Sequence, residues 1–491
     1  MKKLLSYLMV SVLALSLWSC SSSDDDAPVV GIATVTLTPK GSAVSYNAVV
    51  SQATNTISNA DDPFAWDVTD AAIEQTTVKA TATLGATVYC NGAVLPTDGV
   101  TVDLNGKSVT LEVKDASGKV SRAYTLTAVR STEAGTETMV IKSSQFQGFP
   151  SGVVFYDMVN FKGMFYAHVV SVDGETENYE IYNSVDGVNW NKVDYQCAGA
   201  DKFVVGGEGA SIAVLNDKLF IIGGARSKGK DIYGNESETS EGWMGPEVRI
   251  KAFRVYSSTD GVTFTDETAN VKATINGEET AANSLIGTYY STAVHGNNLY
   301  IRGGYSQAYG SWQTKRMFAR TTDGINWEII TLELTNPVTA LHASFFEFNG
   351  KLWVVGGFAN YLDPKNLTNK IHSSSDGVNW IEEGTLPENM TGLMGATPIV
   401  DNGTIYLIGG QIIKEGAPQL TNQIFTSTDG INWTATDAPA TFTARRSPAV
   451  VGMDNVAWIF GGYKNASNTN YAYPEDVDGE LLTDTWAKLM K

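Results

Sequence analysis

The chain has 491 residues, 43 % of them apolar, and its 47 glycines far outnumber its 14 prolines. Such a chain can bury a large core and has the composition of a turn-rich β protein. The formal net charge of -19, with no run of Lys or Arg beyond Lys2-Lys3, disfavours binding to nucleic acid or to anionic lipid surfaces, because both require a basic patch.

The N-terminus has the features of a secretory signal. Lys2-Lys3 precede an apolar run from Leu4 to Leu17, and Cys20 stands where a small residue normally marks the cleavage site. This segment resembles the lipobox of bacterial lipoproteins, which implies removal of residues 1–19 as a signal peptide and diacylation of Cys20. A cleaved signal with an incidental cysteine is the alternative.

Residues 20–29 form an acidic segment that is too polar to fold, and we expect it to be a solvated tether. It resembles the acidic export signal of Bacteroidetes lipoproteins, which implies a lipid-anchored position on the extracellular side of the outer membrane. The lipid on Cys20 would be the only contact with the membrane, because no later stretch is long and apolar enough to span a bilayer.

Residues 30–131 are predicted to form a β-sandwich. Alternating apolar and polar residues indicate half-buried strands at Ala33–Leu37, Val78–Ala82, Val109–Val113 and Tyr124–Ala128. The segment resembles the Ig-like or cadherin-like modules of Bacteroidetes lipoproteins, and we expect it to hold the next domain away from the membrane. Phe64 and Trp66 are either core and loop anchors or a sugar-stacking pair.

The remainder of the chain, residues 138–491, repeats about every 53 residues. Each copy has a Gly-Gly pair after an apolar run and then an Asp-Gly turn followed by an aromatic residue. The pairs begin at Gly223, Gly303, Gly356, Gly409 and Gly461, and the turns contain Asp186, Asp260, Asp323, Asp376 and Asp429. A repeat of this length in short β-type runs predicts the blades of a β-propeller.

Six blades are predicted, because a divergent copy precedes the others around Phe161–Tyr166 and a short copy ends the chain. The last copy lacks an outer strand. The apolar run Met139–Lys142 is expected to supply that strand and close the ring, which removes exposed sheet edges. The Gly pairs are expected where neighbouring blades approach closely, because glycine has no Cβ.

These motifs resemble kelch repeats in a six-bladed arrangement like that of bacterial sialic acid mutarotases and the larger galactose-oxidase propeller. The Asp-Gly hairpins resemble the Asp boxes of sialidases, with one residue fewer between the Asp and the Trp. This resemblance covers residues 138–491 and is specific for the fold rather than for an activity.

The long connections, Gly224–Asp260 and Asp260–Gly303, are predicted to lie on one face of the propeller and to carry its function. They and related links contain planar and polar side chains suited to a sugar face. The candidate ligand-binding residues are Arg226, Trp243, Tyr289, Tyr290, Tyr305, Tyr309, Trp312, Tyr361, Arg445 and Arg446. Binding of a glycan or glycoprotein is the preferred interpretation, and a protein-interaction scaffold is the alternative from another class.

A sugar-processing enzyme is the third interpretation, of the sialic-acid mutarotase, lyase or sialidase type. Glu208 and His342 are the candidate acid-base residues, with Arg445 beside them, and a sialidase-like site would need Arg226, Arg302, Arg445 or Arg446 to hold a carboxylate. No P-loop, GxSxG or HExxH motif is present. We therefore favour a protein without catalytic activity.

No metal or cofactor is expected. A galactose-oxidase-like copper site needs paired histidines, whereas His168, His295, His342 and His372 fall in separate blades. Cys90 and Cys197 fall in different domains, so neither a disulfide nor a structural zinc site is predicted. We expect a monomer.

Overall fold

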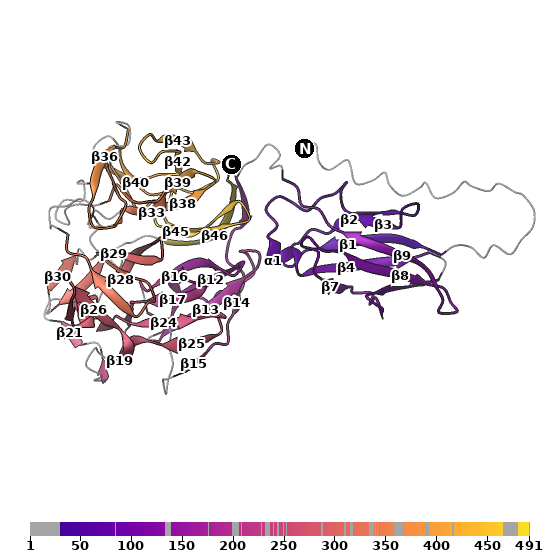
Figure 1. Cartoon of the computed structure of the whole chain (residues 1–491), viewed down its shortest axis with the longest axis horizontal. Helices are drawn as coiled ribbons and strands as arrows, with labels where there is room; N and C mark the ends of the chain where they lie inside the picture. The colour runs from indigo at the N-terminus through magenta and orange to yellow at the C-terminus, as the bar shows by residue number, and fades with distance from the viewer. Residues whose placement is uncertain are drawn as a thin grey trace, which may run out of the picture.

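The computed structural model describes residues 30–490 except 84, 133–138, 175, 199–205, 208, 227, 231–235, 239, 243–244, 249, 252, 286–287, 309–310, 315–317, 333–337, 339, 341, 358–366, 388–391, 415–416 and 465–479. Figure 1 shows two β domains joined in tandem. Within the described residues, helical structure is limited to α1 (Asp70–Ile73) and the two 3-10 turns η1 (Thr268–Asn270) and η2 (Ala282–Leu285), so the all-β prediction is confirmed.

Among the residues that the structure describes, no helix has the length and apolar character needed to cross a membrane.

The N-terminal domain is one curled sheet rather than two separate sheets. Its strands are β1 (Ile32–Thr38), β2 (Tyr46–Ser51), β3 (Thr56–Ser58), β4 (Thr76–Ala82), β5 (Thr87–Cys90), β6 (Ala93–Val94), β7 (Val100–Val102), β8 (Val109–Lys114) and β9 (Val120–Thr127), in the order β6-β5-β8-β9-β3-β2-β1-β4-β7. The first half of β2 pairs with β1 and its second half with β3, which joins what would otherwise be two layers. Leu37 and Val78 share one core with Leu111 and Leu126 from the other half of the sheet.

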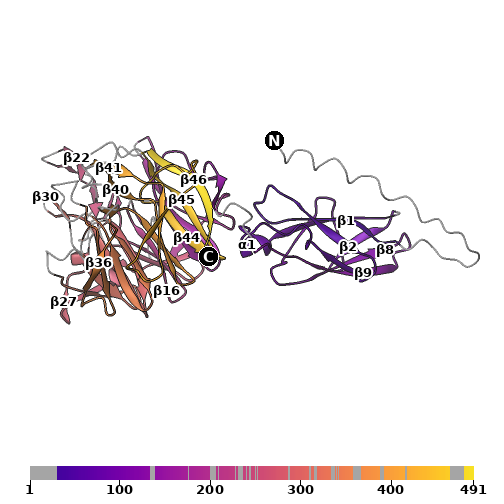
Figure 2. The same ribbon diagram turned by 90° about the horizontal axis from the view of Figure 1, so that it is seen from above.

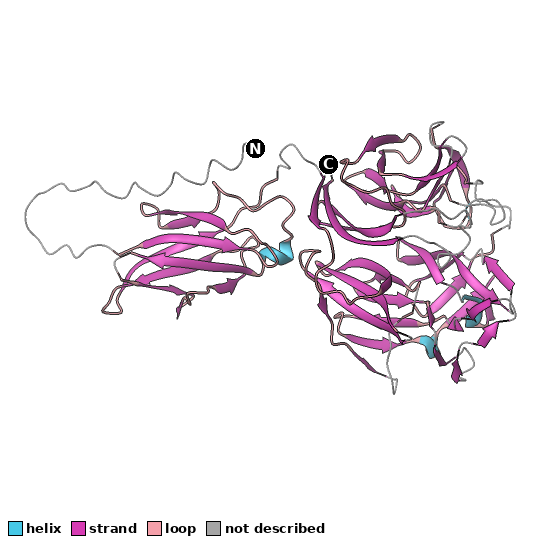
Figure 3. Ribbon diagram, turned by 180° about the vertical axis from the view of Figure 1, so that it is seen from behind, coloured by secondary structure: helices cyan, strands magenta, loops and turns pink. Residues whose placement is uncertain are grey.

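The N-terminal domain packs against one face of the second domain through α1 and the segments around it (Figure 3). Trp66 packs on the aromatic core of the second domain, which identifies it as an anchor. The backbone amide of Asp70 donates to Asp454 at 2.6 Å, and Arg130 lies 2.9 Å from Asp70 and 3.5 Å from Asp454. Phe64 is fully buried in the N-terminal core, so it does not serve as a sugar-stacking residue.

The second domain consists of sheets arranged radially. In chain order, the first sheet contains β11 (Val153–Phe161), β12 (Met164–Asp173), β13 (Thr176–Ser184) and β14 (Asn191–Lys192), and the second contains β15 (Gln196–Ala198), β16 (Ser211–Leu215), β17 (Lys218–Ile222), β24 (Val255–Ser258) and β25 (Thr263–Asp266). The third contains β28 (Thr288–His295), β29 (Asn298–Ala308), β31 (Phe318–Thr321) and β32 (Asn326–Ile329) with the hairpin β26 (Lys272–Ile275) and β27 (Glu278–Thr280), and the fourth contains β33 (Ser344–Phe348), β34 (Lys351–Val355), β35 (Lys370–Ser374) and β36 (Ile381–Thr385). The fifth contains β38 (Thr397–Asp401), β39 (Thr404–Ile408), β42 (Gln423–Ser427) and β43 (Thr434–Asp437), and the last contains β10 (Met139–Ser143), β44 (Ala449–Met453), β45 (Val456–Lys464) and β46 (Glu480–Leu489).

The innermost strands of these sheets, β11, β16, β28, β33, β38 and β44, each contact the next, and β44 contacts β11. A circle of sheets that meet through their first strands is a β-propeller.

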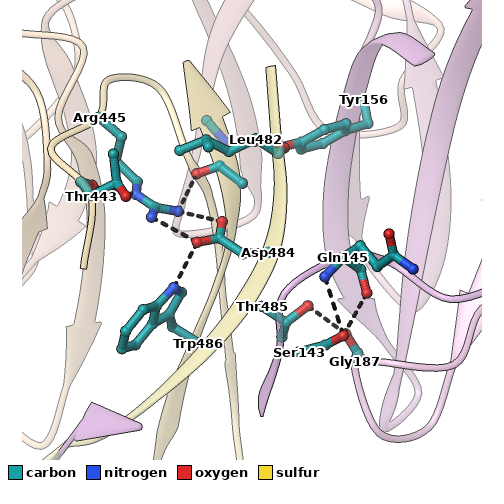
Figure 4. Close-up of polar contacts among 12 residues, drawn as sticks. Ser143, Gln145, Tyr156, Gly187, Thr443, Arg445, Leu482, Asp484, Thr485 and Trp486 are labelled. Atoms are coloured by element: carbon teal, nitrogen blue, oxygen red, sulfur yellow. Dashed lines mark hydrogen bonds and ion pairs between the residues drawn. The ribbon is translucent and has the colours of Figure 1, made fainter. Parts of the chain in front are cut away.

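The propeller is closed by a strand from the beginning of the domain, as predicted. β10 pairs antiparallel with the C-terminal strand β46, matching Met139 with Lys488 and Val140 with Ala487. Beside this joint, the two terminal guanidinium nitrogens of Arg445, Nη1 and Nη2, donate to the Asp484 carboxylate at 2.7 and 2.8 Å (Figure 4). Arg445 is fully buried, so its positive charge needs the Asp484 carboxylate to compensate it.

The first glycine of three Gly-Gly pairs, Gly356, Gly409 and Gly461, lies against the next sheet, as predicted, whereas a Cβ on Gly303 would meet no described residue within 4 Å. Gly356 has a φ of 69°, and a Cβ on it would lie 2.2 Å from the carbonyl oxygen of Leu393 in the next sheet. The amide of Gly357 donates to that carbonyl at 2.6 Å, and the amide of Gly410 donates to Arg445 at 2.7 Å. A side chain at Gly356 would therefore separate the two sheets.

The Asp-Gly turns are stabilised by their aspartates. Asp429 accepts from the amides of Ile431 and Asn432 at 2.8 and 2.7 Å, and Gly430 has a φ of 80°. These hydrogen bonds from backbone amides lower the pKa of Asp429 to about 2. The following aromatic residue, Trp433, closes the turn by donating its indole N–H to the carbonyl of Gly430 at 3.1 Å.

The two long connections lie in different places. The first contains β18 (Ala225–Arg226), β19 (Lys228–Lys230), β20 (Glu236–Glu238), β21 (Ser240–Gly242), β22 (Gly245–Val248) and β23 (Ile250–Lys251). Figure 1 places β21, and Figure 2 places β22, at the end of the propeller remote from the N-terminal domain. The second adds β26 to the outer strand β32 in parallel. The prediction that both extend one loop-rich face is therefore wrong for Asp260–Gly303, whose hairpin covers a sheet edge.

Replacement of Asp484 by Ala is expected to lower the free energy of unfolding by about 3–5 kcal/mol, because it leaves the buried Arg445 guanidinium without its carboxylate. Urea unfolding of the fragment that begins at Ala27 measures the change. Glu480→Ala on the same strand is the matched control, because its ion pair with Lys464 is solvent-exposed and should contribute less than about 1 kcal/mol. Equal effects of the two substitutions would contradict a role for Asp484 in ring closure.

Candidate ligand-binding cavity

A cavity of about 600 Å³ runs between the innermost strands of the propeller. Its walls come from every strand of the inner circle, including Asp157 in β11, Ile212 in β16, Thr292 in β28, Phe346 in β33 and Val450 in β44. The cavity therefore lies on the axis of the ring, where all the sheets contribute side chains.

The cavity extends along the inner strands, and we call its end remote from the N-terminal domain the mouth. Asp454 lies in the turn after β44 and contacts the N-terminal domain, so the end of this innermost strand marks the near side. The residues before β44, including Arg446 and Ser447, therefore lie at the opposite end of the cavity. β22 of the first long connection lies at that same end (Figure 2).

Five residues with left-handed backbone form a collar at this mouth. They are Gly209, Tyr289, His342, Gly395 and Ser447, with φ between 48° and 69°. Tyr289 donates its amide to Gly209 at 2.6 Å, Gly395 to His342 at 2.7 Å, and Ser447 to Gly395 at 2.7 Å. These bonds link equivalent positions of different sheets in two groups, Gly209 with Tyr289, and His342 with Gly395 and Ser447.

Three members of the collar, Tyr289, His342 and Ser447, are not glycine. An L-residue in the left-handed region costs roughly 1–2 kcal/mol relative to the ordinary helical conformation. Such strain persists only where the surroundings enforce it, and it is concentrated at functional sites. The collar is therefore the part of the cavity where side chains are retained against local backbone preference.

Aromatic and charged groups meet at the mouth. The Arg446 guanidinium lies 5.9 Å from the centre of the Tyr463 ring, and the backbones of these two residues pair as an isolated bridge. Tyr289 packs edge-on against Phe155 at 5.5 Å. Burial raises the pKa of Tyr463 to about 12, so its hydroxyl stays protonated at neutral pH.

His342 is neutral at physiological pH. Burial, together with the positive charges of Arg446 and Arg302, lowers the pKa of its imidazole to about 3. A neutral imidazole offers one donor and one acceptor, which suits hydrogen bonding to hydroxyl groups.

Asp157 is an acidic group of the cavity wall whose pKa differs from its ordinary value. Burial raises its pKa to about 6, although the amides of Ile212 and Met158 donate to it at 3.1 and 2.9 Å and favour its charged form. Its protonation therefore changes within a pH range where proteins operate.

The structure brings four of the predicted site residues together at the cavity: Tyr289, Tyr290, His342 and Arg446. Tyr290 is 7 % exposed and its hydroxyl donates to the carbonyl of Leu285, so it serves mainly to hold the wall. Arg445 is a correction. It does not line the cavity, and its guanidinium donates to Asp484, Gly461 and Thr443 rather than toward a ligand.

Glu208, Trp243, Tyr309, Tyr361 and Cys20 lie outside the described residues. For Arg226 in β18, Tyr305 in β29 and Trp312 in β30 (Ser311–Thr314), the structure describes the backbone only. Thus Glu208 and His342 are not placed relative to each other, and their acid-base pairing stays a prediction.

The remaining histidines lie in separate sheets. His168 and His372 are buried in β12 and β35, and His295 lies within 3.1 Å of the carbonyl of Ser375 at the surface. In the part of the chain that the structure describes, no three His, Cys, Asp or Glu side chains are grouped so that they could hold a metal ion. Arg302, also considered for carboxylate binding, is buried and donates to the carbonyls of Val338 and Ala340.

Sequence reasoning missed the collar, although a signal for it exists. Each member stands eleven residues before the aromatic residue of the second strand, as Tyr289 stands before Tyr300 and His342 before Trp353. Glycine occupies this position in two copies, Gly209 and Gly395. Glycine that recurs at one position of a repeat, even where other copies carry a side chain, indicates a positive φ at that position.

Neither a protein-family model nor a curated protein matches the chain. The solved structure of YjhT is 13 % identical in sequence, and its alignment covers 69 % of this chain and 96 % of that one, with a TM-score of 0.45. The cavity is therefore interpreted from its own geometry.

The free energy of unfolding of Asp157→Asn, relative to that of wild type, is expected to increase as the pH rises. Between about pH 4, the unfolded pKa of Asp, and about pH 6, the folded wild type binds more protons than its unfolded chain, so its free energy of unfolding falls with increasing pH. Asn does not titrate, and the difference should change by about 1–3 kcal/mol between pH 4 and pH 7. Urea unfolding at pH 4, 5.5 and 7 measures it. A difference that stays constant over this range would show that Asp157 has an ordinary pKa.

Proposed function

We propose that this protein is a surface-exposed lipoprotein whose six-bladed propeller binds a glycan at the mouth of its central cavity. The observation that supports this most directly is the group formed by Tyr289, His342, Arg446 and Tyr463 around a cavity of about 600 Å³. Pockets for small ligands have volumes of roughly 300–1,000 Å³ and combine apolar walls with a few polar groups.

The chemistry of the mouth suits a sugar. A pyranose presents C–H groups on its faces, which pack on aromatic rings such as those of Tyr289 and Tyr463, and hydroxyl groups at its edge. The neutral imidazole of His342 and the donors of Arg446 can pair with those hydroxyls. The glycan-binding site is thus proposed at the collar, with the first long connection as its outer rim.

The arrangement of the domains suits presentation at a cell surface. The N-terminal domain contacts the face opposite the mouth, and the tether and Cys20 precede that domain in the chain. A lipid on Cys20 would then leave the mouth directed away from the outer membrane on the extracellular side. The proposed partner is a glycan or glycoprotein, the membrane is contacted only through the lipid, and the protein acts as a monomer.

A second candidate function is acid-base chemistry on a sugar, because two titratable groups with displaced pKa values line one cavity. Asp157, with a pKa of about 6, exchanges its proton near neutrality, and His342, which is neutral at pH 7, can hold the sugar hydroxyl through a hydrogen bond. Interconversion of sugar anomers followed by NMR tests this function. Rates that are unchanged in both His342→Gln and Asp157→Asn would exclude these residues as the acid-base groups.

Tyr463→Ala is expected to weaken glycan binding roughly tenfold, because it removes an aromatic surface from the mouth while leaving the core intact. A glycan array with the soluble fragment from Ala27 identifies a probe, and calorimetry with that probe measures the change. Tyr89→Ala, in the N-terminal domain, is the matched control and should bind like the wild type.

Two results would contradict this assignment. Equal affinity of Tyr463→Ala and wild type would remove the mouth from the glycan-binding hypothesis. Absence of any glycan hit, combined with recovery of a defined protein partner by pull-down, would favour the interaction scaffold.

A further inference from the structure

We infer that the segment Trp66–Asp70 of the N-terminal domain is a clamp that keeps the propeller closed. The ring is joined where β10 pairs with β46, and these two strands come from opposite ends of the propeller domain. The N-terminal domain thereby has a task beyond that of a spacer, and this task is independent of the proposed glycan binding.

The clamp contacts both sides of the joint. The Asp67 carboxylate accepts a hydrogen bond from Nζ of Lys142, which lies in β10, at 2.6 Å. Three residues later, the amide of Asp70 donates to the Asp454 carboxylate at 2.6 Å, and Asp454 lies in the turn between β44 and β45. One short segment therefore binds the closing strand and also the C-terminal hairpin of the sheet that this strand completes.

The clamp also contacts the first sheet. The hydroxyl of Thr69 donates to the carbonyl of Val185, which directly follows β13. Close by, Thr485 of β46 donates its hydroxyl to the carbonyl of Gly187 at 2.9 Å (Figure 4). The turn after β13 is thus bonded both to the N-terminal domain and to the C-terminal strand.

Trp66 adds an apolar contact at the same place. It packs on a core that contains Phe165 and Trp190 of the first sheet together with Val451 and Trp458 of the last sheet. This core fills the space between the first and last sheets. The apolar contact and the polar contacts of the clamp therefore converge on one junction of the ring.

The clamp is fixed within its own domain at both ends. Before it, the amide of Phe64 donates to the carbonyl of Val129 at 2.9 Å, and the amide of Ser131 donates to the carbonyl of Phe64 at 2.8 Å. After it, Thr69 caps α1, because its hydroxyl oxygen accepts from the amide of Ala72 at 3.1 Å. A segment held in this way cannot follow β10 and the β44–β45 turn if they move apart.

Opening of the joint therefore breaks contacts of the clamp whichever side moves. If β10 leaves with Lys142, the Asp67 carboxylate, which is 7 % exposed, loses its cation, and an uncompensated buried charge is strongly unfavourable. If the β44–β45 hairpin leaves instead, the hydrogen bond from Asp70 to Asp454 is lost, together with the ion pair between Arg130 and Asp454. The clamp thus supports the pairing of β10 with β46.

Hydrogen exchange of the fragment that begins at Ala27, which contains both domains, tests the clamp. Asp67→Asn keeps the size of the side chain and removes the charge that binds Lys142. We expect the amides of β10 and β46 to exchange roughly tenfold faster in this variant, and those of β39 and β42 in the fifth sheet to exchange as in wild type. Asp103→Asn is the matched control, because its ion pair with Lys107 lies within the N-terminal domain, and it should leave exchange at the joint unchanged.

Arg130→Met tests the other side of the joint. It removes the ion pairs with Asp70 and Asp454 without altering β10, and it should also accelerate exchange in β10 and β46. Exchange in β8 and β9 reports whether the N-terminal domain stays folded in each variant. If β8 and β9 lose protection as well, the joint is measured without its N-terminal domain, and faster exchange there is still expected.

Two outcomes would overturn the inference. One is unchanged exchange in β10 and β46 in both variants, which would leave the N-terminal domain as a spacer. The other is equal acceleration in all sheets of the propeller, because the contacts would then stabilise the whole domain rather than its joint. Neither result depends on a ligand, so the clamp and the glycan-binding function can fail separately.

Discussion

The pairing of β10 with β46 is the contact on which the rest of the propeller depends. The cavity exists only because the inner strands form a circle, and the last sheet of that circle is completed by a segment from the opposite end of the domain. No covalent bond holds this joint among the described residues, whose two cysteines are free. The buried Arg445–Asp484 pair makes β46 specific for its place, because any other partner would leave the guanidinium charge uncompensated.

Once the circle is closed, each sheet positions the next through a repeated contact. The glycine of an Asp-Gly turn packs on the aromatic residue of the neighbouring sheet: a Cβ on Gly324 would lie 2.2 Å from the Phe220 ring, and one on Gly430 would lie 2.7 Å from the Trp353 ring. On the opposite face, the Gly-Gly pairs receive the incoming backbone of the next sheet. Because both contacts depend on missing Cβ atoms, glycines allow neighbouring sheets to approach closely at these points.

This explains how much the sequence could predict. Glycines and Asp-Gly turns recur at fixed spacing, so the repeat and the closing strand follow from pattern alone. The sequence does not distinguish an arginine that forms a buried ion pair from one that lines a cavity. Here the two are neighbours: Arg445 pairs with Asp484, and Arg446 lines the cavity. The β26–β27 hairpin was misplaced because an insertion length does not reveal whether the added residues extend a face or cover a sheet edge.

The mouth is also where local preference and global structure disagree. In the turns between strands elsewhere in the propeller, residue type and apolar alternation agree with one another, as expected for a sequence that specifies one fold. At the mouth, Tyr289, His342 and Ser447 adopt a left-handed backbone although none of them is glycine. Departures from local rules at one end of a repeating scaffold are difficult to attribute to folding, because equivalent positions in other repeats avoid them with Gly209 and Gly395. They are explained if these residues are retained for a ligand that enters at the collar.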